Sequence, residues 1–78
     1  MASKIKKGIY GITQPRVDNV LGTVVVRTPR FHNMMGEIIA IRDSNLKYLT
    51  VQIQSEFRDR VYVVHLVDSQ YEDIRWRH

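Results

Sequence analysis

The 78-residue chain contains no cysteine, which excludes disulfides and thiolate metal sites as sources of stability. This absence also favours a reducing compartment, and we expect the chain to be cytoplasmic. The sequence has no apolar run near the ~18 residues that a membrane helix needs. No hydrophobic segment follows its first lysines, as a signal peptide would require. We therefore expect no membrane partner.

Glycine and proline are also scarce, at four and two residues, and no glycine-rich phosphate loop is present. The three histidines, His32, His65 and His78, do not have metal-ligand spacing. A single domain of this size has a thin core and no room for the dry pocket in which paired carboxylates act. We therefore expect no metal site, no cofactor and no catalytic residue.

The feature that is present is a pair of alternating strand segments, residues 34–42 and residues 48–54, and in the second of them polar and apolar residues alternate for seven positions. Asp43, Ser44 and Asn45 favour a tight turn between the two segments. Alternation with a period of two predicts strands with one buried face and one face exposed to solvent. These residues therefore predict a β-hairpin.

Further short segments have β-strand or turn character. Strands are predicted at residues 21–28, which Pro29 stops, and at residues 61–67 and 72–76. Residues 68–71 predict a single helical turn that Asp68 can cap. Residues 8–13 could form a short strand or an extended arm, and residues 14–19 predict a loop.

Five short strands with one helical turn before the last is the order of an SH3-like small barrel. We therefore predict an all-β fold, with the five-stranded barrel in residues 20–78 and a basic N-terminal arm or extra strand in residues 1–19.

Three segments carry a family resemblance: Val24-Val25-Val26-Arg27-Thr28-Pro29, Gly36-Glu37-Ile38-Ile39-Ala40-Ile41 and Tyr48-Leu49-Thr50-Val51-Gln52-Ile53. They resemble KOW-type domains and the small stromal subunit of photosystem I, in which an Arg-x-Pro strand end precedes a glycine that opens the next strand. This resemblance, from Thr23 to Ile74, implies the barrel fold. Residues 1–8 are similar to the start of a small SH3-like subunit of cyanobacterial NADH-dehydrogenase-like complexes.

Val51-Gln52-Ile53 also resembles part of the Val-Gln-Ile-Tyr motif of the type II dihydrofolate reductases, which are SH3-like chains of similar length. Gln54 stands where that motif has tyrosine. The segment also lies on the third core strand instead of the strand before the helical turn. We therefore do not carry that activity over, and predict a non-enzymatic chain.

The net charge of +4 is concentrated in the first half of the chain. Residues 1–42 hold seven basic and two acidic residues, a balance of +5, and residues 43–78 hold five and six, a balance of −1. A positive field of this kind attracts polyanions or acidic protein surfaces.

The candidate binding residues fall in two loops that neighbour each other in SH3-like folds, and in the N-terminal arm. They are Arg27, Arg30, Phe31 and His32 in the first loop, Arg58 and Arg60 in the second, and Lys4, Lys6 and Lys7 in the arm. Arginine side chains bind phosphate groups in bidentate fashion. Aromatic rings stack on unpaired bases. Alternatively, Phe31 and Phe57 close the ends of the barrel and the arginines are only solvated. Trp76 could close the core or anchor an interface.

These residues predict a binding module. The first hypothesis is a regulator of the KOW kind that contacts RNA, DNA or the transcription or translation machinery. The alternative is a protein–protein adaptor, either an accessory subunit of a larger complex or a phage-type inhibitor of a host enzyme.

Overall fold

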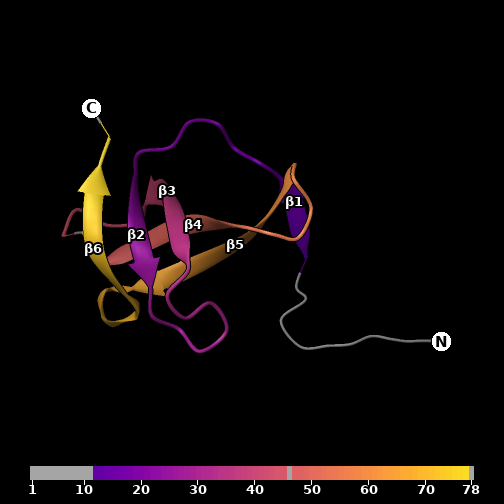
Figure 1. Ribbon diagram of the computed structural model, residues 1–78. Coiled ribbons are helices and arrows are strands. Elements are labelled where there is room, and N and C mark those ends of the chain that lie inside the picture. Colours follow the sequence, from indigo (N-terminus) through magenta and orange to yellow (C-terminus); the bar gives the residue numbers. More distant parts are fainter. Residues whose placement is uncertain (1–11, 46, 78) are drawn as a thin grey trace.

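A computed structural model describes residues 12–45 and 47–77 of the chain. Six strands form one antiparallel sheet, in the order β1-β5-β4-β3-β2-β6 (Figure 1). Their bounds are Thr13–Pro15 for β1, Gly22–Val26 for β2, Met35–Ile41 for β3, Tyr48–Gln54 for β4, Arg60–Val67 for β5 and Tyr71–Trp76 for β6. The prediction of an all-β fold is confirmed.

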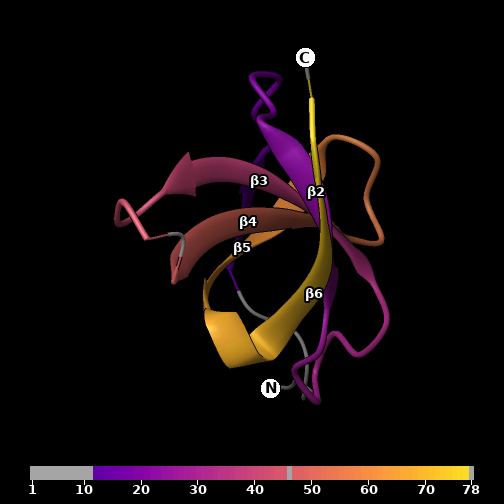
Figure 2. The same cartoon turned by 90° about the vertical axis from the view of Figure 1, so that its left-hand side faces the viewer.

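The sheet follows the chain from β2 to β5 as a meander, and β6 then returns to pair with β2. β2 and β6 run across the direction of β3, β4 and β5, so the sheet is strongly bent (Figure 2). The register between β3 and β4 shifts between Ile38 and Ala40. A bulge of this kind adds a residue to one strand and increases the local bend.

The core fills the concave side of this bend. Alternate residues of the central strands supply most of it, as the sequence pattern predicts: Val24, Val26, Ile38, Leu49, Val51 and Ile53. Tyr62, Leu66 and Tyr71 add to it from β5 and β6, and Phe31 adds to it from the β2–β3 loop. Burial of these side chains is the main source of stability for a chain without disulfides.

The sheet has a sixth strand beside the five predicted for the barrel, within the segment 1–19 that the sequence predicts as an arm or an extra strand. β1 spans the end of the predicted strand or arm at residues 8–13 and the start of the predicted loop, and it pairs with β5, so that Thr13 faces Tyr62 and Pro15 faces Arg60. Pro15 is tolerated there because β1 is an edge strand, where a missing N–H leaves no ladder bond broken. Arg60 Nε also donates to Thr13 Oγ1 at 3.2 Å. The predicted arm residues Lys4, Lys6 and Lys7 lie outside the described residues.

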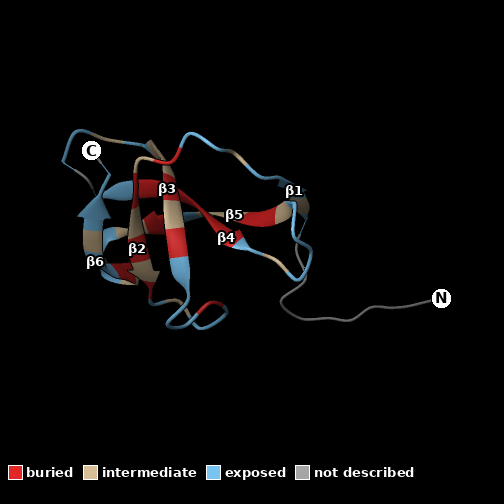
Figure 3. Cartoon of the chain, turned by 45° about the horizontal axis from the view of Figure 1, so that its top comes forward, coloured by how far each residue is buried: buried red, intermediate tan, exposed pale blue. Residues whose placement is uncertain are grey.

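The predicted solvent-exposed face of β4 is a second correction. Thr50 and Gln52 are buried, with exposed fractions of 6% and 1%, and β4 is buried along its length except at its ends (Figure 3). The Gln52 amide donates to the carbonyl oxygen of Val17 at 2.7 Å and accepts from the N–H of Val17 at 3.0 Å. The β1–β2 connection therefore docks onto the polar side of β4.

The predicted helical turn is confirmed as a 3₁₀ turn, Asp68–Gln70, before the last strand. Asp68 does not cap it, because the capping bond instead joins the Val67 N–H to Gln70 Oε1 at 3.0 Å. Within residues 12–45 and 47–77, this three-residue turn is the one helical element. No helix in these ranges is long and apolar enough to cross a membrane.

The free edge of the sheet at β6 is irregular. Thr23 pairs with Arg75 but Val25 pairs with Glu72, so β6 carries an extra residue at this point. Asp73 lies there with a positive φ of 58°, a conformation that Asp and Asn adopt more readily than other residues with side chains. β6 therefore bends away from a straight edge.

Candidate nucleic-acid interface

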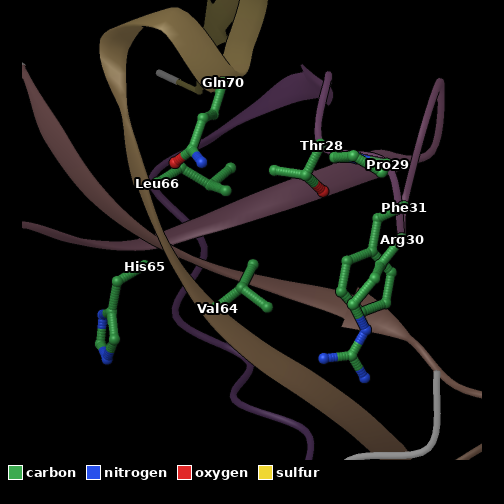
Figure 4. Close-up of a pocket in the computed structure, with 8 residues that line it drawn as sticks. All are labelled: Thr28, Pro29, Arg30, Phe31, Val64, His65, Leu66 and Gln70. Carbon is green, nitrogen blue, oxygen red and sulfur yellow. The ribbon is translucent and has the colours of Figure 1, made fainter. Parts of the chain in front are cut away.

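Two hollows lie on opposite sides of β5 and share His65. We call the first the Gln70 pocket: it has a volume of about 400 Å³ and is lined by residues 28–31, residues 64–66 and Gln70 (Figure 4). The second, the Tyr48 pocket, has a volume of about 380 Å³ and is lined by Arg42, Tyr48 and His65. We call the surface that passes around the edge of β5 and includes both hollows the groove. Among the described residues, no carboxylate lines either pocket.

The register of β4 and β5 brings the side chains of the Tyr48 pocket together. Thr50 pairs directly with His65, and directly paired residues lie on the same face of a sheet. Thr50 Oγ1 and His65 Nδ1 lie 3.0 Å apart, within hydrogen-bond distance, which orients the imidazole ring. Tyr48 is two residues from Thr50 and shares its face. The Arg42 N–H donates to the Tyr48 carbonyl at 2.8 Å, which holds Arg42 at the base of the hairpin.

Arg30 and Phe31 form the wall of the Gln70 pocket. The Phe31 ring is buried, with a centroid 5.6 Å from that of Tyr62, and this contact anchors the β2–β3 loop on the core. The Arg30 guanidinium lies 5.6 Å from the Phe31 ring centroid, which is a cation–π geometry. Arg30 is therefore held at the pocket while Phe31 serves the core.

The other predicted residues of the first loop do not line the groove. Arg27 turns toward the loop and β6, where Nη1 donates to Asn33 Oδ1 at 2.7 Å and lies 3.8 Å from a Glu72 oxygen. His32 is exposed in the loop. Of the four predicted residues of this loop, the structure thus places Arg30 and Phe31 at the groove.

The predicted residues of the β4–β5 connection lie on a different surface. Arg58 and the exposed Phe57 line a separate hollow formed by residues 54–58. Arg60 bonds to Thr13 on β1. The two loops are linked through Tyr62, whose ring contacts Phe31 and whose hydroxyl donates to Glu56 Oε1 at 2.9 Å. The structure therefore connects the loops but gives each a hollow of its own.

The described residues are nearly neutral overall. Nine of the 12 basic residues and all eight acidic residues lie in the described ranges, a balance of +1, and Lys4, Lys6 and Lys7 supply the other three charges. Arg16 forms a bidentate pair with Glu37, and Arg75 lies 3.5 Å from Asp73. The positive charge of the groove comes from Arg30 and Arg42, which line its two pockets.

Sequence reasoning did not select Arg42, Tyr48, His65 or Gln70 as binding residues. His65 is exposed. The signal that would have joined them is the β4–β5 register, because it places Tyr48 and His65 on one face. That register is a long-range property which alternation within one strand does not determine.

No protein-family model, curated protein or solved structure gives a significant match to this chain, so the groove itself is the basis for a functional proposal.

Proposed function

We propose that the chain is a non-enzymatic binding module that holds single-stranded nucleic acid in the groove, as a regulator acting on RNA, DNA or the transcription or translation machinery. One observation carries this proposal: two pockets that share His65, one on each side of β5, present Arg30, Arg42, His65 and Tyr48, with no carboxylate among their described lining residues. Arginine forks bind phosphate oxygens in bidentate fashion, and a positively charged groove with an aromatic side chain is the general solution for single strands.

The exposed ring of Tyr48 supplies the stacking surface in this proposal. Tyr48 is 49% exposed, so a base can lie against its face without displacing the core. Stacking on an aromatic side chain contributes about 1–3 kcal/mol per base and tolerates any sequence. Arg42 beside it would neutralise the adjoining phosphate.

We also infer that the sheet is an SH3-like barrel of the KOW kind, built from β2 to β6 and extended by β1. The neighbour order β5-β4-β3-β2-β6 and the 3₁₀ turn before β6 support this inference. In this arrangement the groove lies between the β2–β3 loop and the β3–β4 hairpin.

The proposal is tested by fluorescence anisotropy with labelled ten-nucleotide single strands across a salt series. We expect micromolar affinity at low salt that falls steeply with salt, because binding releases counterions from the phosphates. The variants Arg30→Ala and Arg42→Ala should each weaken binding and reduce the salt slope by about 0.7, the contribution of one phosphate contact on a single strand.

Two matched arginine variants locate the interface. Arg75→Ala removes an exposed arginine outside both hollows and should leave affinity unchanged. Arg58→Ala tests the surface that the sequence predicts: loss of binding there, with Arg30→Ala and Arg42→Ala unaffected, would move the interface to the β4–β5 connection. Absence of binding by any single strand at low salt would refute the proposal.

The adaptor function has one observation in its favour. Met35 and Phe57 are 64% and 58% exposed, and they line two hollows that adjoin at Gln54. Exposed methionine and aromatic side chains are enriched in protein interfaces. A pull-down that recovers one stoichiometric protein after nuclease treatment, and loses it with Met35→Ser and Phe57→Ser, would favour this function.

A further inference from the structure

The amide of the Gln70 side chain has a fixed orientation. Its Oε1 accepts the hydrogen bond of the Val67 N–H at 3.0 Å, so the amide cannot turn over without leaving that backbone donor unpaired. The other end of the amide, Nε2, makes no hydrogen bond to the described residues. Figure 4 shows this end of Gln70 beside Leu66, where the side chain lines the pocket. Gln70 therefore presents the N–H donors of Nε2 to a ligand.

The charged side chain of the Gln70 pocket, Arg30, also presents donors. Arg30 carries only N–H donors, and its guanidinium is held by the Phe31 ring. Pro29, Val64 and Leu66 supply apolar walls against which the face of a flat ring can lie. The volume of about 400 Å³ is within the range of pockets that bind small organic groups.

We propose that the Gln70 pocket takes one unstacked base of the bound strand and selects a pyrimidine with two ring carbonyls, the edge shared by uracil and thymine. This inference rests on the proposed function and assigns a base preference to the same groove. Single-stranded bases are commonly splayed out, packed on side chains and read on their Watson–Crick edges.

Hydrogen-bond complementarity decides which base fits. Uracil and thymine present two carbonyl oxygens, which accept bonds from Gln70 Nε2 and the Arg30 guanidinium. Cytosine, adenine and guanine each present an exocyclic amino group on the Watson–Crick edge, which would set donor against donor at Gln70 or at Arg30. A buried donor left without an acceptor loses its bonds to water, and this penalty is the source of the selectivity. The apolar walls bind all pyrimidines alike.

The test compares labelled oligonucleotides of ten uridines, ten deoxythymidines, ten cytidines and ten adenosines at one salt concentration. We expect the uridine and thymidine strands to bind at least about fivefold tighter than the cytidine strand, the low end of what one well-placed base contact supplies. The uridine and thymidine arms differ in sugar and methyl group, and so separate RNA from DNA as the source of the base.

The variant Gln70→Glu is the decisive one. One carboxylate oxygen can still accept the Val67 N–H, so the 3₁₀ turn is kept, while the other oxygen presents an acceptor where Nε2 donated. We expect the ratio of uridine to cytidine affinity to fall to one or below. Gln14→Glu adds the same charge at an exposed position on β1, outside the pockets, and should leave that ratio unchanged. Thermal melts of both variants check that the fold is retained.

Each outcome is decisive. A uridine preference that Gln70→Glu abolishes and Gln14→Glu retains supports the pocket. Equal binding of all four strands, or a preference that Gln70→Glu does not change, overturns the base assignment and leaves the proposed function standing. Absence of binding by every strand overturns both.

Discussion

Glu37 is the residue through which three segments of the chain meet on the outer side of the sheet. It lies on β3, forms a bidentate pair with Arg16 and accepts a hydrogen bond from Gln52 Nε2 at 3.1 Å. The hydrogen bond from Arg16 lowers the pKa of the Glu37 carboxyl below its ordinary value of 4.5, and Gln52 adds to this effect, while partial burial opposes it. The ionised form of Glu37 is therefore the one that the folded state prefers.

This pKa shift predicts a pH dependence of stability. A carboxyl whose pKa is lower in the folded state contributes its stability fully above the unfolded pKa, near 4.5, and loses it as the pH falls through the lower folded value. We expect Glu37→Gln to lower the free energy of unfolding by about 1 kcal/mol at neutral pH, as for a hydrogen-bonded pair that is partly exposed. Urea unfolding of both proteins between pH 7 and about pH 3 measures the difference, which should shrink on acidification.

A variant that is equally destabilised at both ends of this pH range would contradict the account, because the loss would then not depend on the charge of Glu37. The wild-type curve alone does not isolate this group, since other carboxylates titrate in the same range. The comparison with Glu37→Gln isolates it.

At the scale of elements, the pattern of the chain predicts the five strands β2 to β6 to within two residues at each end. Alternation is a local property, and it is enough to identify Leu49, Val51 and Ile53 as the core face of β4. Alternation does not predict which residues cover the other face of the strand. Gln52 is covered by Val17, which lies 35 residues away in the sequence. Thr13 on β1 is bonded by Arg60, which lies 47 residues away. A pattern within one strand holds no information about such distant partners.

The candidate site also contains residues that a local pattern identifies and residues that only long-range contacts identify. Arg30 could be selected from the sequence because arginine in a loop is informative by its residue type. Gln70 could not, since its use depends on the bond that fixes one end of its amide. Tyr48 and His65 needed the register of two strands.

The pairing of β2 with β6 predicts different costs for two glycine substitutions. A Cβ at Gly22 would lie 2.5 Å from the backbone oxygen of Arg75 on β6, which cannot move without breaking the strand pair. A Cβ at Gly36 would lie 3.1 Å and 3.2 Å from methyl groups of Val26 and Val51, which can adjust. We expect Gly22→Ala to lower the free energy of unfolding by about 1–3 kcal/mol, and Gly36→Ala to cost clearly less.

Urea unfolding of the two alanine variants measures both values. Gly36→Ala is the matched control, because it makes the same chemical change at a buried strand position. Equal losses would mean that the close approach of β6 to Gly22 does not limit the fold.

At the scale of the whole molecule, charge and groove are separate features. The described residues carry a balance of +1, and Lys4, Lys6 and Lys7 carry the remaining +3. The sheet with its loops therefore supplies the shape of the groove, while most of the net charge lies at the start of the chain. Under the proposed function, general attraction and recognition should be separable by mutation.

The triple variant Lys4→Ala, Lys6→Ala, Lys7→Ala tests this separation. If these lysines contact phosphates, it should weaken binding of every single strand alike and reduce the slope of log affinity against log salt by about two, since each phosphate contact contributes roughly 0.7 for a single strand. The ratio of uridine to cytidine affinity should stay the same. Anisotropy across a salt series measures both quantities, and an unchanged slope would exclude phosphate contacts by these lysines.

The bend at Asp73 bears on how the folded chain behaves at high concentration. A long, straight outer strand offers a regular row of donors and acceptors on which further chains can add and grow into fibrils. On β6 the positive φ of Asp73 interrupts that row, and the charged side chains of Glu72, Asp73 and Arg75 are exposed along it. Because of this interruption and these charges, the β6 edge of the sheet is a poor template for amyloid growth.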